Sequence, residues 1–381
     1  MAEGRPNSVE ETGRRLLGLL ANSIVLHGCP DRIGQAVPSL AQGAKGILDL
    51  VLRGTVVEGL LSISISKSVL ERGKLIAEPF PGSGFRCVDR IVVVRLHLLD
   101  GTYELFRSFF GRPGRLAPDG REVGATLGII ETTLSLLREP EVTHLAAATD
   151  TVIESFRNEM FAGYKDGAGV EQVLLDQFPL AERAFAAIGV VCWGMIEYEA
   201  DDAIATASFR WCEDVSQVVI CTPDKDLSQC VIGDRVVTLN RREQKIYNED
   251  GIREKFGVGP ESIPDYLALV GDTADGVPGL PGWGAKSAGA VLKRWHKLEA
   301  IPPNPREWGV AVRGADKLAL VLIERFEDAL LYRDLTTLRQ NVPLTESLDD
   351  LEWKGVPREA FLAFCDELGF DDIRTRPHLW Q

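Results

Sequence analysis

The sequence lacks any apolar segment long enough to cross a membrane. No run reaches the roughly 18 residues that a spanning helix needs, and the N-terminus, Met-Ala-Glu-Gly-Arg, has no charged segment followed by an apolar one, as a secretory signal would. Hydrophobic residues make up 45% and charged residues 26% of the 381 residues, as in ordinary globular proteins. We therefore expect a monomeric cytoplasmic protein of two or three domains that does not bind membranes.

The sequence also lacks an excess of positive charge. It contains 42 lysines and arginines against 56 aspartates and glutamates, which gives a net charge of −14. Nucleic-acid-binding proteins normally show a basic surface, so the net charge alone argues against that class. A metal-dependent nuclease is an exception, because its acidic residues hold ions inside the site while basic groups line the approach.

Histidine and cysteine are too few and too scattered to form a zinc site. There are 5 histidines and 7 cysteines, and no group of them has the spacing of zinc ligands. An odd number of cysteines without a close pair indicates reduced thiols in a cytosolic protein. A metal centre in this chain would therefore need oxygen ligands.

From residue 91 onward, short β-branched apolar segments alternate with helical patterns. The segments that we expect to be strands are 91–99, 144–149, 189–193 and 218–221. Helical patterns cover 123–138, 171–187 and 202–214, and then 248–256, 262–269, 285–295 and 317–333. This alternation predicts an α/β fold with a central, mostly parallel sheet, helices on both faces and a helical region after it.

The pattern divides the chain into four parts. Residues 1–90 contain no cluster of residues with evident chemistry and are expected to be an N-terminal extension of unassigned role. Residues 91–247 form the expected α/β domain, 248–345 the helical region, and 346–381 a C-terminal helical tail.

Acidic residues follow each of the four expected strands. Parallel strands end at one edge of a sheet, where ligands bind, so we expect these carboxylates to converge. Like charges are unfavourable together unless cations neutralise them, and hard oxygen ligands select Mg²⁺ or Mn²⁺. With two acids further along the chain, the nine candidates are Asp100, Asp150, Glu199, Asp201, Asp202, Asp224, Asp226, Asp272 and Asp275.

The stretch 269–288 combines acidic residues with a glycine-rich loop. Asp272 and Asp275 precede Gly279-Leu-Pro-Gly-Trp-Gly284, and an amphipathic helix begins near Ala285. Glycines let backbone N–H groups approach another surface, and a helix N-terminus attracts phosphate. A capped turn between two helices, without a ligand, would have the same composition.

Several motifs, in this order and spacing, resemble the 5′ nuclease family. This family includes the 5′–3′ exonuclease domain of bacterial DNA polymerase I, phage 5′ exonucleases and flap endonucleases. The resemblance spans residues from about 93 to 345. It is carried by Leu98-Leu-Asp-Gly-Thr-Tyr-Glu-Leu-Phe-Arg107, Phe156-Arg-Asn-Glu, Tyr164-Lys165, Tyr198-Glu-Ala-Asp-Asp-Ala-Ile204, Thr222-Pro-Asp-Lys-Asp-Leu-Ser-Gln229 and the stretch 269–288.

The resemblance implies a PIN-like fold and hydrolysis of DNA phosphodiesters with two Mg²⁺ or Mn²⁺ ions. One ion site would use Asp100, Asp150, Glu199 and Asp201, and the other Asp202, Asp224, Asp226, Asp272 and Asp275. Lys165 and Arg157 would contact the scissile phosphate, with Asp201 as a further catalytic residue. Other expected DNA contacts are Arg107, Tyr164, Lys225, and the Gly279, Gly282, Gly284 and Lys286 of the stretch 269–288.

In this family the stretch 269–288 corresponds to a helix-three-turn-helix clamp that grips duplex DNA and can bind K⁺. The resemblance therefore implies a free-standing 5′–3′ exonuclease or 5′-flap endonuclease that acts in primer removal and DNA repair. The expected substrate is a duplex with a 5′ single-stranded end or flap, and an RNA primer–DNA hybrid stays open as a further substrate.

One departure from the family concerns the arch segment after Lys165. The family often has a basic residue three positions later, where this chain has Ala168. Two other functions stay open at this point. A non-catalytic DNA-binding protein would have lost metal carboxylates, but all nine are present. A PIN-type ribonuclease shares the acidic α/β architecture but lacks the glycine-rich clamp after the sheet.

Overall fold

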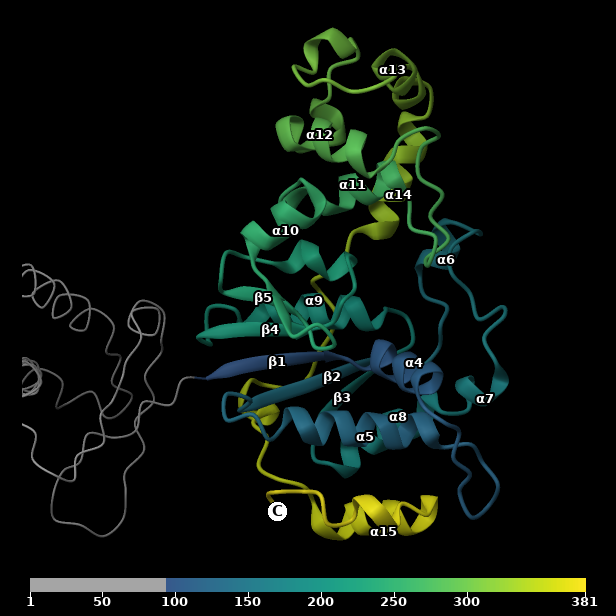
Figure 1. Ribbon diagram of the computed structural model, residues 1–381, viewed down its shortest axis with the longest axis vertical. Coiled ribbons are helices and arrows are strands. Elements are labelled where there is room, and N and C mark those ends of the chain that lie inside the picture. Colours follow the sequence, from purple (N-terminus) through teal and green to yellow (C-terminus); the bar gives the residue numbers. More distant parts are fainter. Residues whose placement is uncertain (1–93) are drawn as a thin grey trace, which may run out of the picture. The chain divides into compact units, whose positions relative to one another are not determined.

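The computed structural model describes residues 94–381 (Figure 1). The expected extension 1–90 and the first residues of the strand expected at 91–99 lie outside the described residues. None of the helices between residues 94 and 381 is both long and apolar enough to span a membrane.

The centre of the fold is a six-stranded sheet in the order β3-β2-β1-β4-β5-β6. Strands β1 to β5 pair in parallel and β6 is antiparallel to β5. Since β2 and β4 flank β1 on opposite sides, the winding of the sheet reverses beside β1, where ligand sites form in such folds. The strands are β1 (Arg95–Asp100), β2 (His144–Asp150), β3 (Val191–Met195), β4 (Gln217–Cys221), β5 (Val236–Asn240) and β6 (Lys245–Tyr247).

Helices cover both faces of the sheet, as the alternating pattern predicted (Figure 1). On one face lie α4 (Gly101–Gly111), α5 (Gly124–Leu136) and α8 (Phe178–Ala187), and on the other lies α9 (Ala200–Trp211). The single helix expected at 171–187 is instead two, α7 (Gln172–Leu175) and α8, with Pro179 in the first turn of α8. Proline fits a first turn but not a helix interior, which explains the break.

A helical region with its own hydrophobic core follows the sheet. Its main contact joins α11 to α14, and α12 packs on α11. The helix expected at 317–333 is two helices, because the backbone at Arg325 leaves the helical conformation. The helices are α10 (Glu249–Phe256), α11 (Ile263–Val270), α12 (Ala285–Trp295), α13 (Ala315–Glu324) and α14 (Phe326–Thr336).

The C-terminal tail returns to the α/β part. Helix α15 (Arg358–Leu368) packs against α8. Ion pairs join Glu367 to Arg121 and Arg183, and the backbone of Val356 pairs with Leu379 and Gln381. The tail thus lies against the α8 face of the sheet, away from the helical region at the other end of Figure 1.

Candidate active site

Two acids end adjacent strands at the reversal of the sheet. Asp100, the last residue of β1, accepts hydrogen bonds from Tyr103 N and Thr222 Oγ1, both at 2.8 Å. Asp150 ends β2 and accepts one from Ala200 N at 2.8 Å, at the start of α9. Each carboxylate therefore connects its strand to the N-terminus of a helix, and the parallel register holds both at one edge.

Two more acids lie at the start of α9. Glu199 Oε1 accepts a hydrogen bond from Ser155 Oγ at 2.6 Å, and Glu199 Oε2 lies 3.0 Å from Lys165 Nζ. Burial raises the pKa of Asp201 well above its usual value, and the charges of Asp224 and Asp100 raise it further. Asp201 therefore lies close to Asp100, which ends β1, and to Asp224, which follows β4.

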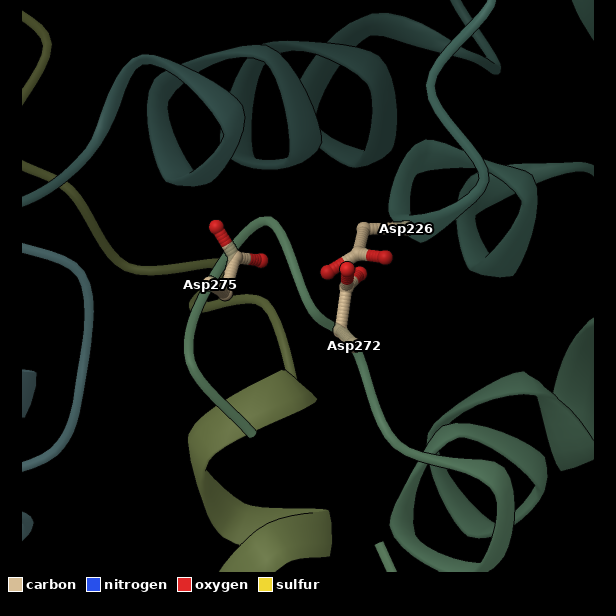
Figure 2. A group of neighbouring side chains, drawn as sticks. All are labelled: Asp226, Asp272 and Asp275. Atoms are coloured by element: carbon tan, nitrogen blue, oxygen red, sulfur yellow. The ribbon is translucent and has the colours of Figure 1, made fainter. Parts of the chain in front are cut away.

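A second acidic group is formed by Asp226, Asp272 and Asp275 (Figure 2). One oxygen of each lies within 4.8 Å of the others. Asp226 follows β4 in the turn η2 (Asp226–Cys230), whereas the other two lie in the loop after α11. The buried Asp226 Oδ1 has no hydrogen-bond partner among the described residues. Three carboxylates with an unpartnered oxygen match the ligands that Mg²⁺ and Mn²⁺ prefer.

The electrostatics of both groups favour a bound cation. Burial raises the pKa of Asp100 to about 7 and that of Asp275 to about 6. The pKa of Asp226 lies well above its usual value, first through burial and then through Asp224 and Asp275. Buried carboxylates with raised pKa values are stabilised in the ionised form by a positive charge nearby, which divalent ions would supply.

Lys165 lies between the two acidic groups. Its Nζ is 3.0 Å from Glu199 and 3.4 Å from Asp275. Its backbone N–H donates to Asp275 O at 3.0 Å, and its carbonyl accepts from Asn158 Nδ2 at 2.9 Å. The expected catalytic lysine is therefore held against the carboxylates from both sides.

Two residues expected to bind DNA contact the carboxylates in this structure. Tyr164 is 4% exposed, and its hydroxyl donates to Glu199 Oε2 at 3.2 Å, so it supports the acidic site from within. Lys225 is half-buried, with Nζ 2.5 Å from Asp272 Oδ2. Arg107 forms an ion pair with Glu104 of its own helix, α4.

The geometry argues against the expected roles of Arg157 and Asp202. Arg157 is fully buried and binds both oxygens of Asp202, at 2.7 and 2.8 Å, so its guanidinium faces a carboxylate of the protein and no open surface. Asp202 also accepts hydrogen bonds from the backbone N–H groups of Glu199 and Arg339, so a metal ion at Asp202 would have to compete with the guanidinium and two backbone donors. Sequence spacing placed both residues near the site but could not reveal that they pair.

The three glycines of the loop 279–284 have different surroundings. Gly279 is buried with φ +68°, and a Cβ there would lie 2.5 Å from Gly271 N, so packing alone requires this glycine. Gly282 is exposed with φ +83°, and Gly284 has open space around it. These two glycines, Lys286 and Arg313 line a hollow at the N-terminus of α12. Sequence reasoning missed Arg313, because nothing in the chain order places the loop before α13 beside α12.

Family models match most of the described chain. Residues 95–257 match the model described as 5′-3′ exonuclease, N-terminal resolvase-like domain, and residues 258–359 match the one described as 5′-3′ exonuclease, C-terminal SAM fold. A curated 5′-3′ exonuclease of Aquifex aeolicus is 31% identical over 273 residues, or 69% of this chain and 94% of the relative.

Other similar proteins include DNA polymerases and solved nuclease structures. DNA polymerase I of Bacillus caldotenax is 32% identical over 283 residues, 73% of this chain and 32% of the relative, so the chain spans about a third of that relative. T5 5′-exonuclease with bound zinc matches with a TM-score of 0.52 at 19% identity, covering 64% of this chain and 89% of that chain. The catalytic core of Rad2 in complex with DNA matches with a TM-score of 0.50 at 13% identity, over 73% and 89%. Both likenesses confirm the predicted fold.

Proposed function

Because the chain belongs to the 5′–3′ exonuclease family, we propose that it hydrolyses DNA phosphodiesters with two divalent cations. The substrate is a duplex with a 5′ end or a 5′ flap. The observation that carries this proposal is the acidic centre, in which Asp226 Oδ1 is buried without a hydrogen bond beside Asp272 and Asp275.

Two sets of carboxylates would hold the ions, Mg²⁺ or Mn²⁺. Asp100, Asp150, Glu199 and Asp201 form one set, and Asp224, Asp226, Asp272 and Asp275 form the other. Such ions activate water and stabilise charge on the attacking and leaving oxygens of a phosphodiester. With Asp202 bound to Arg157, the second set has one ligand fewer than the sequence suggested.

Lys165 is the group of this chain best placed to bind the reacting phosphate. Its side chain is about a quarter exposed, 24%, whereas that of Arg157 is buried. A phosphate arriving at the carboxylate edge meets an ammonium group already oriented by Glu199 and Asp275. A fixed positive charge contributes most as negative charge grows on the phosphoryl oxygens.

Unpaired cations near the acidic edge and on the clamp support DNA binding. Lys286 and Arg313 line the hollow at α12, and neither forms an ion pair within residues 94–381. Lys245 and Lys255 lie over the ring of Tyr247, at 4.6 and 5.0 Å from its centre. Cations without acidic partners fit phosphate contacts, which position a protein on DNA without reading its sequence.

Several finer points belong to the same proposal. The loop 279–284 acts as a duplex clamp that can hold K⁺, the protein works as a cytoplasmic monomer, and it acts in primer removal and repair. Residues 91–247, 248–345 and 346–381 are the proposed catalytic, DNA-binding and C-terminal parts.

A cleavage assay on a labelled 5′-flap duplex tests the proposal. We expect cleavage near the flap base with Mg²⁺ and none with EDTA. Single-stranded RNA of matched sequence tests for a PIN-type ribonuclease, and a duplex without a flap tests for a nuclease that does not select 5′ flaps. Tight flap binding without cleavage in Mg²⁺ or Mn²⁺ would favour the non-catalytic DNA-binding protein and contradict the proposal.

A further inference from the structure

A buried guanidinium connects the acidic centre with the helical region. Arg157, at the start of α6 (Arg157–Met160), binds both oxygens of Asp202 on α9. Its Nε donates to Leu335 O at 2.7 Å and its Nη2 to Thr337 O at 3.1 Å. Asp202 Oδ1 accepts from Arg339 N at 2.8 Å. We call these five residues the Arg157 clasp.

The clasp joins three segments that are far apart in the sequence. One runs from β2 into α6, one is the N-terminus of α9, and one is the segment that leaves α14. The ring of Phe156 lies 4.6 Å from the Arg157 guanidinium and 5.0 Å from that of Arg339. The backbone that leaves the helical region is thereby fixed to the helix that carries Glu199 and Asp201.

The clasp also holds Glu199 at two points. Asp202 Oδ2 accepts a hydrogen bond from Glu199 N at 3.1 Å, and Arg157 Nη1 lies 3.4 Å from Glu199 Oε1. The same Oε1 accepts the hydrogen bond from Ser155 Oγ. Loss of the guanidinium would remove one contact of the Glu199 carboxylate and would leave Asp202, which holds the Glu199 backbone, without its charged partner.

Stability alone does not explain such a pair. A buried ion pair is often no more stabilising than apolar residues of similar volume, although removal of one partner costs about 3–5 kcal/mol. Groups that orient metal ligands, by contrast, typically change metal affinity by about 10- to 100-fold when they are lost. These two expectations separate a structural pair from a positioning one.

We propose that Arg157 is a positioning residue, which fixes Glu199 through Asp202 and connects the segment leaving the helical region to the metal centre. The proposal rests on the function proposed above. Arg157 touches no substrate. It keeps the carboxylate of Glu199 in the orientation that a divalent ion needs, and it transmits the position of α14 to that carboxylate.

A pair of apolar substitutions tests the proposal. Arg157→Met alone leaves Asp202 buried and unpaired, so we expect a lower melting temperature. The double variant Arg157→Met/Asp202→Leu removes both charges and is expected to recover part of that loss, because four backbone groups of the clasp still lose their hydrogen-bond partners. Its affinity for Mn²⁺, measured by calorimetry without DNA, should nevertheless fall by about 10- to 100-fold. Arg157→Lys keeps the charge but not the two parallel hydrogen bonds, and is expected to show the same loss of Mn²⁺ affinity.

Arg333→Met is the matched control. Arg333, on α14, also pairs with a fully buried carboxylate, Asp265 on α11, although Lys297 contacts Asp265 as well. Its ion pairs within the described residues are with Asp265 and Glu299, and neither is a proposed metal ligand. This variant should lose stability and keep its Mn²⁺ affinity.

A double variant that recovers both melting temperature and Mn²⁺ affinity would overturn the proposal. If the double variant does not fold, unchanged Mn²⁺ affinity in folded Arg157→Lys overturns it equally. A wild-type protein that binds no divalent ion would overturn this proposal and the proposed function together, whereas failure of the clasp alone leaves flap cleavage by the wild type intact.

Discussion

The acidic residues of the centre do not all have the same role, and their hydrogen bonds separate them. Asp226 has a buried oxygen without a hydrogen-bond partner among the described residues. Both oxygens of Asp202, by contrast, bind the Arg157 guanidinium and a backbone N–H group. Glu199 is an intermediate case. Lys165 contacts one of its carboxylate oxygens and Ser155 the other, so both oxygens are oriented by side chains. A residue in the acidic motif is therefore a weaker ligand candidate where a buried guanidinium already binds both of its oxygens.

The first prediction concerns Asp201, which lies among Asp100, Asp224 and Asp226. Asp201→Ala removes one carboxylate from the proposed ion sites, so flap cleavage should fall by several orders of magnitude while duplex binding stays measurable. Single-turnover cleavage and a binding titration in Ca²⁺ check this. Glu359→Gln, an exposed acid on α15, is the control and should cleave normally. Normal cleavage by Asp201→Ala would contradict the metal assignment.

The second prediction concerns pH. The pKa values of Asp275 and Asp100 are raised to about 6 and about 7, above the unfolded value of about 3.9. The folded state therefore binds these protons more tightly, and the resulting stabilisation is lost as pH rises through the folded pKa values. In EDTA we expect the melting temperature to fall between about pH 5 and pH 7.5.

Divalent ions should reverse that trend, because they bind the ionised carboxylates. The gain in melting temperature on adding Mg²⁺ should therefore grow from about pH 5 to pH 7.5. Subtracting the EDTA curve from the Mg²⁺ curve removes titrations that do not involve the site, such as that of His97, whose pKa burial lowers to about 4. A gain that shrinks as pH rises would contradict the prediction.

At the scale of elements, the sequence predicted the four strands that carry acids and most helices between them. It missed β5 and β6, because Thr238 and Asn240 interrupt the apolar pattern of Val236–Asn240, and Lys245–Tyr247 has only three residues. It predicted continuous helices where Pro179 and Arg325 interrupt them. The order of strands and acids in the sequence indicated which carboxylates share an edge of the sheet, because parallel strands end at the same edge. Pairing between side chains, such as that of Arg157 with Asp202, could not be predicted because it depends on how distant segments pack.

The third prediction uses the clamp loop. Gly284 has φ −147° and precedes α12, with no neighbouring atom within 4 Å of an added Cβ. Aspartate is a favourable N-cap, so Gly284→Asp should keep or raise the melting temperature. Its charge would face a DNA phosphate in the hollow, so duplex affinity should fall. Gly284→Asn, with the same shape and no charge, is the control. Equal duplex affinity in the two folded variants would contradict the clamp assignment.

The fourth prediction concerns the arch segment. Ala168 is exposed, and its N–H donates to Asp166 Oδ1 in a turn. Ala168→Arg adds a cation where the family often has one, so we expect a several-fold lower KM for a duplex with a long 5′ flap and a steeper dependence on salt. Ala168→Gln controls for side-chain length. An unchanged KM for Ala168→Arg would show that the arch does not contact the flap.

At the scale of the whole molecule, the net charge of −14 no longer argues against nucleic acid. Carboxylates are concentrated at one edge of the sheet, and unpaired cations lie on α12, on the loop before α13 and around Tyr247. A divalent ion at each acidic group would offset part of the local negative charge. DNA affinity should therefore depend on metal as well as on salt.

The last prediction concerns the boundary of the functional unit. Residues 95–381 form a compact unit of their own, β1 begins at Arg95, and the family match also begins at residue 95. A variant that starts at Arg90 keeps every strand of the sheet and all nine acids of the motifs. We expect it to be soluble, to melt cooperatively and to cleave a 5′ flap at the rate of the full chain, because none of the proposed ligands or DNA contacts precedes Asp100.

A variant that starts at Leu99 is the control. It loses most of the central strand, which pairs with both β2 and β4, and should not fold. A folded but inactive variant starting at Arg90 would show that residues 1–89 contribute to the site.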